Sequence, residues 1–124
     1  MDNKLREAVL EALARRDVEA AKRLLADVHR EKAYLLGDHY LGRDVADGAA
    51  RLHALHIALI SLLYGEAEAG GVTGADLALA SSFARARATC GPVEPPTAPE
   101  GLADLYRAAA QELSRLVEEL CSRS

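Results

Sequence analysis

Aromatic residues are scarce in this chain of 124 residues, which has one Phe, four Tyr and no Trp. Half of the residues are nevertheless apolar, so the core must be built from Leu, Ala, Val and Ile. An Ala-rich sequence with few β-branched or aromatic residues favours helices over strands, and this composition argues against a sheet protein. The length suits one domain with a single core, and we expect residues 1–124 to form it.

Basic clusters are also missing. The net charge is −4, and no run of Lys or Arg exceeds two residues. Binding to nucleic acid needs a basic surface that matches the phosphates, so a nucleic-acid partner is not expected. No stretch contains the roughly 20 apolar residues that span a membrane, and the charged N-terminus lacks the apolar core of a signal peptide. We therefore expect a cytoplasmic protein without a membrane partner or a cofactor.

Cysteines and side-chain amides are few. Cys90 and Cys121 lie near the ends of predicted helices, and no CxxC pair supports a metal role. In a reducing cytosol two free thiols are the expected state, with a disulfide as the alternative. Asn3 and Gln111 are the only amides, a depletion typical of thermophilic proteins. A GC-rich genome explains the abundance of Arg and Ala equally well.

One segment of the chain is used twice. Residues 16–37 and 43–65 both open with Arg-Asp-Val, and Ala, Arg and Leu recur at matching positions when one residue is inserted. Each copy predicts one long helix with an Asp cap at its start and a Gly at its end. These Arg-Asp-Val starts resemble the hairpin turns of tetratricopeptide-like repeats, which bind peptides in a concave groove. The starts are 27 residues apart and each precedes one long helix, so a bundle is favoured over a solenoid.

The hydrophobic spacing predicts five helices, hence an all-α, antiparallel up-and-down bundle with four long helices and a shorter N-terminal helix. They are expected at about residues 3–15, 18–36, 45–69, 74–90 and 98–121. Asp2, Asp17 and Thr73 should cap three of them, and Gly37 should end the second. All four prolines lie in a linker over residues 91–99, where Thr97 and Glu100 have the spacing of a capping box for the last helix.

The third and fifth predicted helices carry more apolar surface than the others. No charge interrupts the third between His53 and Tyr64, and such a helix belongs at the centre of a bundle or against a second subunit. The fifth has apolar residues spaced alternately four and three apart, as in a coiled coil. We therefore predict a non-enzymatic interaction or scaffolding module that self-associates as a homodimer or binds another protein. The predicted interface comprises Leu59, Leu63, Leu102, Tyr106, Leu113, Leu116 and Leu120.

Arg51 and His56 form an Arg-x4-His pattern on the third predicted helix. This pattern resembles the motif of HEPN-domain ribonucleases, helical bundles that dimerise so that two motifs meet in a cleft. The resemblance implies that Arg51 would bind the scissile phosphate and His56 would position or activate the 2′-hydroxyl, without a metal. Leu52 departs from the family, which usually has a polar residue after the Arg. A metal-independent ribonuclease or nucleotide-handling domain is the first alternative function.

His53 and His56 are three residues apart, so they share one face of the same helix. With His29 or His39 they could hold a metal ion. Between His53 and Tyr64 the helix lacks the carboxylates that di-iron bundles use. A bundle that binds a metal or a small ligand is the second alternative function.

Overall fold

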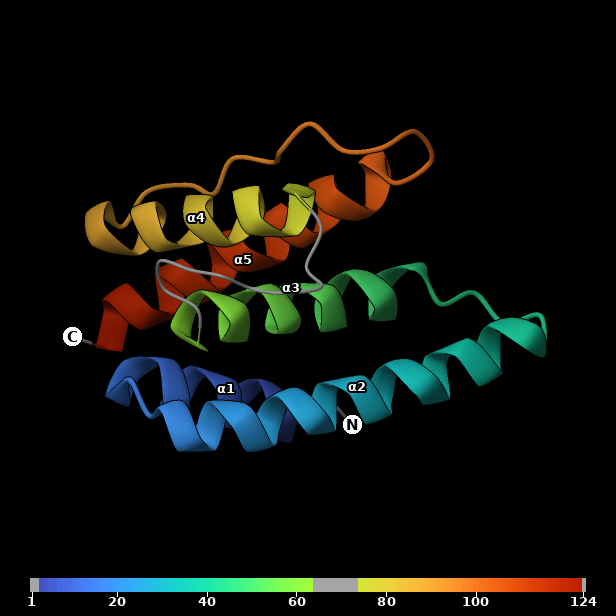
Figure 1. The fold of residues 1–124 in the computed structure, drawn as a ribbon, viewed down its shortest axis with the longest axis horizontal. Coiled ribbons are helices and arrows are strands. Elements are labelled where there is room, and N and C mark those ends of the chain that lie inside the picture. The colour runs from blue at the N-terminus through green and yellow to red at the C-terminus, as the bar shows by residue number, and fades with distance from the viewer. Residues whose placement is uncertain (1–2, 64–73, 124) are drawn as a thin grey trace.

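The computed structural model of the protein describes residues 3–63 and 74–123, which form five packed helices (Figure 1). They are α1 (Asn3–Arg15), α2 (Val18–Tyr40), α3 (Ala46–Leu63), α4 (Gly74–Thr89) and α5 (Ala103–Arg123). These two ranges contain no strand, which confirms the all-α bundle. Within them, no helix combines the length and apolarity needed to cross a membrane. The predicted caps at Asp2 and Thr73 and the predicted end of the third helix lie outside the described residues.

The directions of the helices divide the bundle into two parts. α1, α2 and α3 alternate in direction, as an up-and-down bundle requires, whereas α4 and α5 run the same way as α3 (Figure 1). Asp76 near the start of α4 contacts Tyr106 near the start of α5, and Cys90 after α4 is bonded to Cys121 near the end of α5. Residues 91–102 therefore return along the bundle. A connection of this length can span up to about 40 Å, more than the roughly 24 Å of α4.

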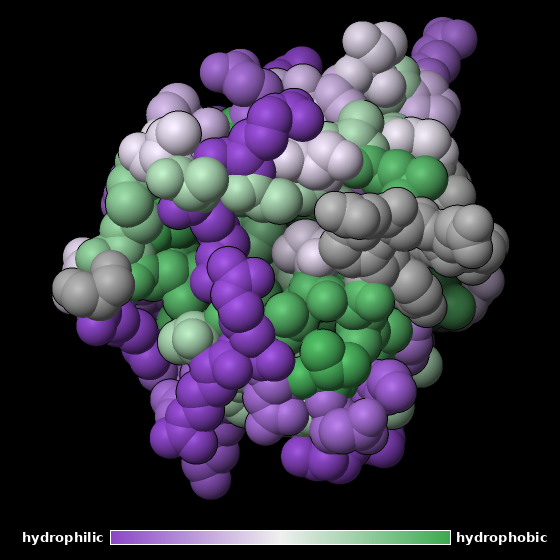
Figure 2. Space-filling model, turned by 60° about the vertical axis from the view of Figure 1, so that its left-hand side comes forward, coloured by the Kyte–Doolittle hydropathy of each residue, from purple (hydrophilic) through white to green (hydrophobic). Residues whose placement is uncertain are grey.

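Apolar and charged side chains are interspersed on the surface. Figure 2, which turns the left-hand end of Figure 1 forward, shows a band of hydrophilic side chains between apolar areas. α1 and α5 are also joined by ion pairs, from Arg6 to Glu119 and from Arg123 to Glu7, the second at 2.8 Å. Pairs this exposed add little stability, so the bundle depends on its core.

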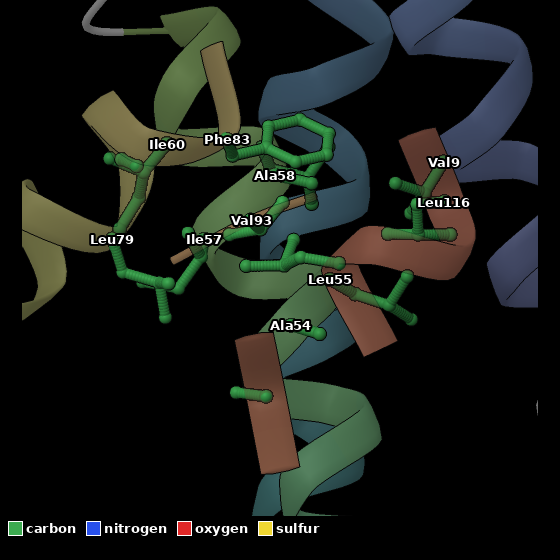
Figure 3. Packing of buried hydrophobic residues seen from close by; sticks show 14 of the residues in the cluster. Val9, Ala54, Leu55, Ile57, Ala58, Ile60, Leu79, Phe83, Val93 and Leu116 are labelled. Carbon is green, nitrogen blue, oxygen red and sulfur yellow. The ribbon is translucent and has the colours of Figure 1, made fainter. Parts of the chain in front are cut away.

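α3 lies at the centre of the bundle and packs against all four other helices. Figure 3 shows side chains from α1, α3, α4, α5 and the linker meeting around it. Ile57 of α3, Phe83 of α4 and Leu113 of α5 are completely buried. The predicted apolar helix thus lies at the centre of the bundle, one of the two places that its charge-free stretch suggested.

The two copies of the repeated segment begin as predicted. The Asp17 carboxylate accepts the backbone N–H of Ala20 at 3.0 Å and so caps α2. Asp44 accepts the N–H of Ala46 at 3.1 Å at the start of α3. Each carboxylate satisfies a backbone donor that the first helical turn would otherwise leave unpaired.

The end of α2 differs from the prediction. The helix continues through Gly37 to Tyr40, and Gly42 adopts φ +82° instead. The N–H of Arg43 donates to the carbonyl of Asp38 at 3.1 Å, as in a Schellman cap. The prediction that α2 ends at Gly37 was wrong, because Gly42, further along the chain, takes the left-handed position. α2 gains an additional turn, which contributes to the site described below.

The start of α5 was also predicted wrongly. The helix begins at Ala103, so the capping box of Thr97 and Glu100 starts no helix. Gly101 adopts φ +88°, and the N–H of Leu102 donates to the carbonyl of Pro99 at 3.0 Å. This turn separates the proline-rich linker from α5. The non-helical connection therefore extends beyond the predicted range of 91–99.

The linker is attached to the bundle rather than standing away from it. Val93 is buried, and its N–H donates to the Ser114 hydroxyl of α5 at 3.0 Å. The N–H of Glu94 donates to the Ser82 hydroxyl of α4 at 2.9 Å. Two short polar side chains thus satisfy backbone donors that lack a helical partner.

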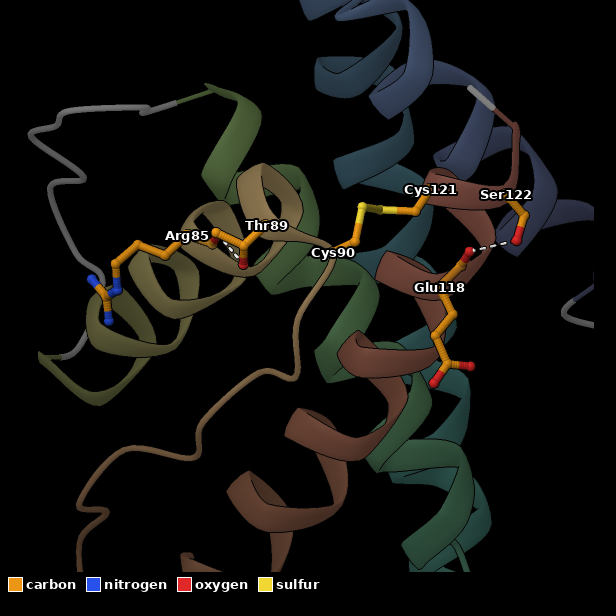
Figure 4. Close-up of a disulfide and its surroundings, with 6 residues drawn as sticks. All are labelled: Arg85, Thr89, Cys90, Glu118, Cys121 and Ser122. Carbon is orange, nitrogen blue, oxygen red and sulfur yellow. Dashed lines mark hydrogen bonds between the residues drawn. A yellow bond between two sulfur atoms is a disulfide. The ribbon is translucent and has the colours of Figure 1, made fainter.

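Cys90 and Cys121 form a disulfide, with their Cα atoms 6.1 Å apart (Figure 4). Cys90 follows the last turn of α4 at φ +54°, and the N–H of Gly91 closes that turn by donating to the carbonyl of Ala86 at 3.1 Å. The expectation of two free thiols was wrong, because the shared direction of α4 and α5 brings their C-terminal ends together. We call the part of the bundle around this bond the disulfide end.

Candidate functional site

Five polar side chains from four helices meet on one side of α3. This polar cluster consists of Lys32, His53, His56, Asp76 and Tyr106. His53 and His56 share one face of α3, as their spacing predicted. α2 places Lys32 against that face, and the adjacent starts of α4 and α5 supply Asp76 and Tyr106.

Lys32 links the two histidines. Its Nζ lies 2.7 Å from Nδ1 of His56 and 3.4 Å from Nδ1 of His53. An ammonium only donates, so both Nδ1 atoms accept and each neutral ring carries its proton on Nε2. The Nε2 of His53 donates to Oδ1 of Asp76 at 2.8 Å. A neutral imidazole therefore connects a cation to an anion.

Asp76 is the anionic end of this chain and is buried. Besides the proton from His53, its Oδ1 accepts the hydroxyl proton of Tyr106 at 2.6 Å. The rings of Tyr106 and His53 meet edge to face, with centroids 5.3 Å apart. A buried carboxylate is tolerated when it is paired and hydrogen-bonded, and both conditions are met here.

Burial shifts the proton affinities of the bases in the cluster. It lowers the pKa of Lys32, and the charge of Asp76 opposes that shift. Burial followed by the charge of Lys32 lowers the pKa of His53, against the effects of Asp76. The pKa of His56 falls to about 4, through burial and then the charges of Lys32 and the other imidazoles. Both histidines of the cluster are therefore neutral at pH 7.

An open groove of about 310 Å³ borders the polar cluster. It is lined by Lys32, Leu35, Leu36, His39, Val45, Ala49, His53 and Leu105. We call it the α2–α3–α5 groove. Most of its lining is apolar, and Lys32 and His53 belong both to the groove and to the cluster. The additional turn of α2 supplies His39.

The histidines predicted as metal ligands lie close together. The ring centroids of His29 and His56 are 5.1 Å apart, and those of His53 and His56 are 5.7 Å apart. Across residues 3–63 and 74–123, however, no group of three or more His, Cys, Asp or Glu is arranged to hold a metal ion. The Lys32 ammonium occupies the position between the two Nδ1 atoms and would repel a second cation there.

Arg51 and His56, the pair of the ribonuclease hypothesis, are not brought together. Residues five apart on a helix are rotated by about 140° from each other. Arg51 is exposed, whereas His56 is half-buried and accepts a hydrogen bond from Lys32. A phosphate held by Arg51 would not meet this imidazole within one chain, so the ribonuclease hypothesis requires two motifs to meet across a dimer and stays a prediction.

The predicted interface residues lie mostly inside the chain itself. Leu59, Tyr106, Leu113, Leu116 and Leu120 are buried, Leu63 is half-buried, and Leu102 is 41% exposed. The seam of α5 packs largely against α3 and its neighbours. The seam therefore needs no second subunit, and self-association stays a prediction that these contacts do not test.

The sequence reasoning missed the roles of Lys32 and Asp76. Lys32 follows Val28 by four residues and precedes Leu35 by three, which places a charge in the inward-facing row of its helix. Asp76 precedes Leu79 by three residues and Phe83 by seven, so it too lies in an inward-facing row. Such an interruption of an apolar row marks a buried charge that needs partners, and it could have identified both residues. Their actual partners lie on other helices.

Comparison with protein-family models, with curated proteins and with solved structures finds no match for this chain. The function is therefore inferred from the geometry of the site itself.

Proposed function

We propose that the protein binds a small, mainly apolar molecule in the α2–α3–α5 groove, with an oxygen-bearing head group directed at Lys32. The observation that supports this proposal is that the apolar groove and the polar cluster share two residues, Lys32 and His53. Small-molecule sites combine apolar walls with a few polar groups that fix orientation. The groove volume, about 310 Å³, is near the lower limit of such sites, which favours a short ligand.

The head group follows from the donors of Lys32. An ammonium has three N–H groups, and the two imidazoles accept two of them. The third can donate to an oxygen that enters the groove, whereas a cationic head would be repelled. A charge-assisted hydrogen bond of this kind is worth about 1.5–3 kcal/mol. Carboxylate and carbonyl groups are the head groups that fit.

Hexanoate is a suitable probe because it joins a short apolar chain to a carboxylate. In an NMR titration we expect amide shifts concentrated at Leu36, Ala49 and Leu105. Lys32→Met keeps most of the apolar stem but removes the ammonium, and it should weaken binding by about tenfold or more. Lys22→Met, at an exposed position of the same helix, is the control. Absent shifts, or equal weakening by both substitutions, would contradict the proposal.

Self-association is a second candidate, favoured by the free end of α2 rather than by the predicted seam. Tyr34, Leu36, Tyr40 and Leu41 are all more than half exposed there. Exposed apolar groups gathered on one segment are typical of protein contacts. Sedimentation velocity over a wide concentration range should show a dimer, and a double variant Tyr40→Glu, Leu41→Glu should abolish it. A chain that stays monomeric throughout would remove this candidate.

A cytoplasmic location and a thermophilic source remain predictions, and the disulfide connects them. Such bonds are rare in cytosolic proteins of mesophiles but common inside hyperthermophiles. If the disulfide forms in the cell, a cytoplasmic location therefore favours a thermophilic source. Alkylation of free thiols in intact host cells, followed by mass spectrometry, should find Cys90 and Cys121 bonded in the cytosolic fraction; two alkylated cysteines there would refute this pairing.

A further inference from the structure

We infer that Lys32 is a nucleophilic amine that forms an imine with an aldehyde or ketone bound in the α2–α3–α5 groove. This inference rests on the proposed function, since it needs a ligand in that groove, and it narrows the head group to a carbonyl. The site would then perform covalent chemistry rather than binding alone.

The geometry supplies what an amine nucleophile requires. Nζ of Lys32 is within 2.7 Å of one neutral imidazole nitrogen and 3.4 Å of another, so a proton acceptor is already in hydrogen-bond contact. Lys32 also lines the groove, so a bound carbonyl carbon can approach the nitrogen. Half-burial of the ammonium and the resulting fall in the pKa of Lys32 favour the neutral amine.

The reaction balances without a further reagent. The Lys32 ammonium transfers one proton to Nδ1 of His56, whose pKa rises once Lys32 no longer carries the charge that lowers it. The neutral amine then attacks the carbonyl carbon. As the C–N bond forms, the nitrogen passes one of its two protons to the carbonyl oxygen, which becomes the hydroxyl of a neutral carbinolamine. The His56 imidazolium returns its proton to that hydroxyl, which leaves as water while the nitrogen lone pair completes the C=N bond. The products are a protonated imine and one water molecule.

The chain contains its own reference amines. Its three lysines are Lys4, Lys22 and Lys32. Lys4 and Lys22 are exposed, and Lys22 forms an ion pair with Glu19 at 3.4 Å. Neither lines the groove. Their reactivity in the same tube therefore measures the background reaction of an ordinary surface lysine.

The test is reductive trapping with hexanal and sodium cyanoborohydride at pH 7, followed by peptide mapping with mass spectrometry. Each unit by which the pKa of an amine falls raises the fraction of free amine about tenfold. Since the groove holds the aldehyde beside Lys32 and the lowered pKa raises the share of free amine, we expect the hexyl group on Lys32 to appear several times faster than on Lys4 or Lys22. Hexanoate should slow labelling of Lys32 alone. Lys22→Arg should leave the rate at Lys32 unchanged, and Lys32→Arg should leave only background labelling.

The outcomes separate this inference from the proposed function. If hexanoate binds in the groove but Lys32 is trapped no faster than Lys22, the imine is refuted and binding stands. If neither probe engages the groove, both proposals fail. Fast trapping that hexanoate does not slow would mean that Lys32 reacts without a bound ligand, which also overturns the inference. The comparison among three lysines of the unmodified chain does not depend on any variant folding.

Discussion

At the disulfide end, direct contacts fix the positions of α1, α4 and α5 relative to one another. Cys90 is bonded to Cys121, and the Arg87 guanidinium donates to the carbonyl of Leu13 at the end of α1 at 3.2 Å. At the opposite end, where α2 finishes, Tyr40 and Leu41 are 79% and 71% exposed. There the α2–α3–α5 groove opens beside the polar cluster. No disulfide joins the helices at this end, because both cysteines of the chain are bonded at the other.

This difference shows how a small bundle can accommodate buried charges. Removing Lys32 and Asp76 from water is costly, and their contacts return only part of that cost. The dry core and the disulfide supply the stability that the groove region does not. We therefore expect substitutions near the disulfide end to act on folding, and substitutions in the polar cluster to act on binding and on pH dependence.

The largest loss of stability is expected in the core around α3. Phe83→Ala removes the only Phe, which is completely buried, and should lower the free energy of unfolding by about 3–5 kcal/mol in urea denaturation. The control is Leu77→Ala on the same helix, since Leu77 is 37% exposed and should cost clearly less. Similar losses for both would mean that the core is not packed as described.

A somewhat smaller loss is expected when the disulfide is removed. The bonded cysteines are 31 residues apart in sequence, and closing a loop of this size stabilises a protein by about 2–4 kcal/mol. The double variant Cys90→Ser, Cys121→Ser should show this loss in urea denaturation, as should the natural chain in dithiothreitol. Hexanoate binding by the folded variant should be unchanged. A matching loss of affinity would show that the two ends are not independent.

A further effect is expected from His56 and appears only as acid is added. The pKa of His56 is about 4 in the folded chain, against 6.5 for an ordinary histidine. As the pH falls, the unfolded chain therefore takes up the proton first. The stability that neutral His56 contributes is complete above pH 6.5 and is lost as the pH falls towards 4. In urea denaturation between pH 7 and 4, the free energy of unfolding should therefore fall less steeply for His56→Gln than for the natural chain. His39→Gln, at an exposed position and not among the groups that lower the pKa of His56, should keep the natural slope, and parallel curves for all three proteins would contradict this assignment.

Local features of the sequence predicted most of the helix bounds, but they failed at the end of α2 and at the start of α5. Asp17 caps α2, and Asp44 accepts the first backbone N–H of α3, because a carboxylate can satisfy only nearby backbone donors. Gly37 misled because several glycines near a helix end can each take the left-handed position, and Gly42 takes it here. The capping-box spacing at Thr97 likewise had no effect, because the turn at Gly101 intervenes.

The candidate site was only half predictable. Helical spacing alone puts His53 and His56 on one face of α3, so a site there could be expected from the sequence. Lys32 was missed, although it puts a charge in an apolar row, and Tyr106 was predicted to belong to an interface. Which of these groups would meet depended on helix directions that periodicity does not encode. For the same reason, the sequence could not decide whether Cys90 and Cys121 are bonded.

By itself, the sequence determined the helical class and the shared face of the two histidines of α3. These follow from composition and from the period of 3.6 residues, which act within one segment. The tertiary structure alone decided that α4 and α5 run parallel to α3, that two cysteines meet, and that a lysine joins two imidazoles beside a groove. The physical reason is that such contacts join residues far apart in the chain, and their formation depends on how whole helices pack rather than on any local pattern.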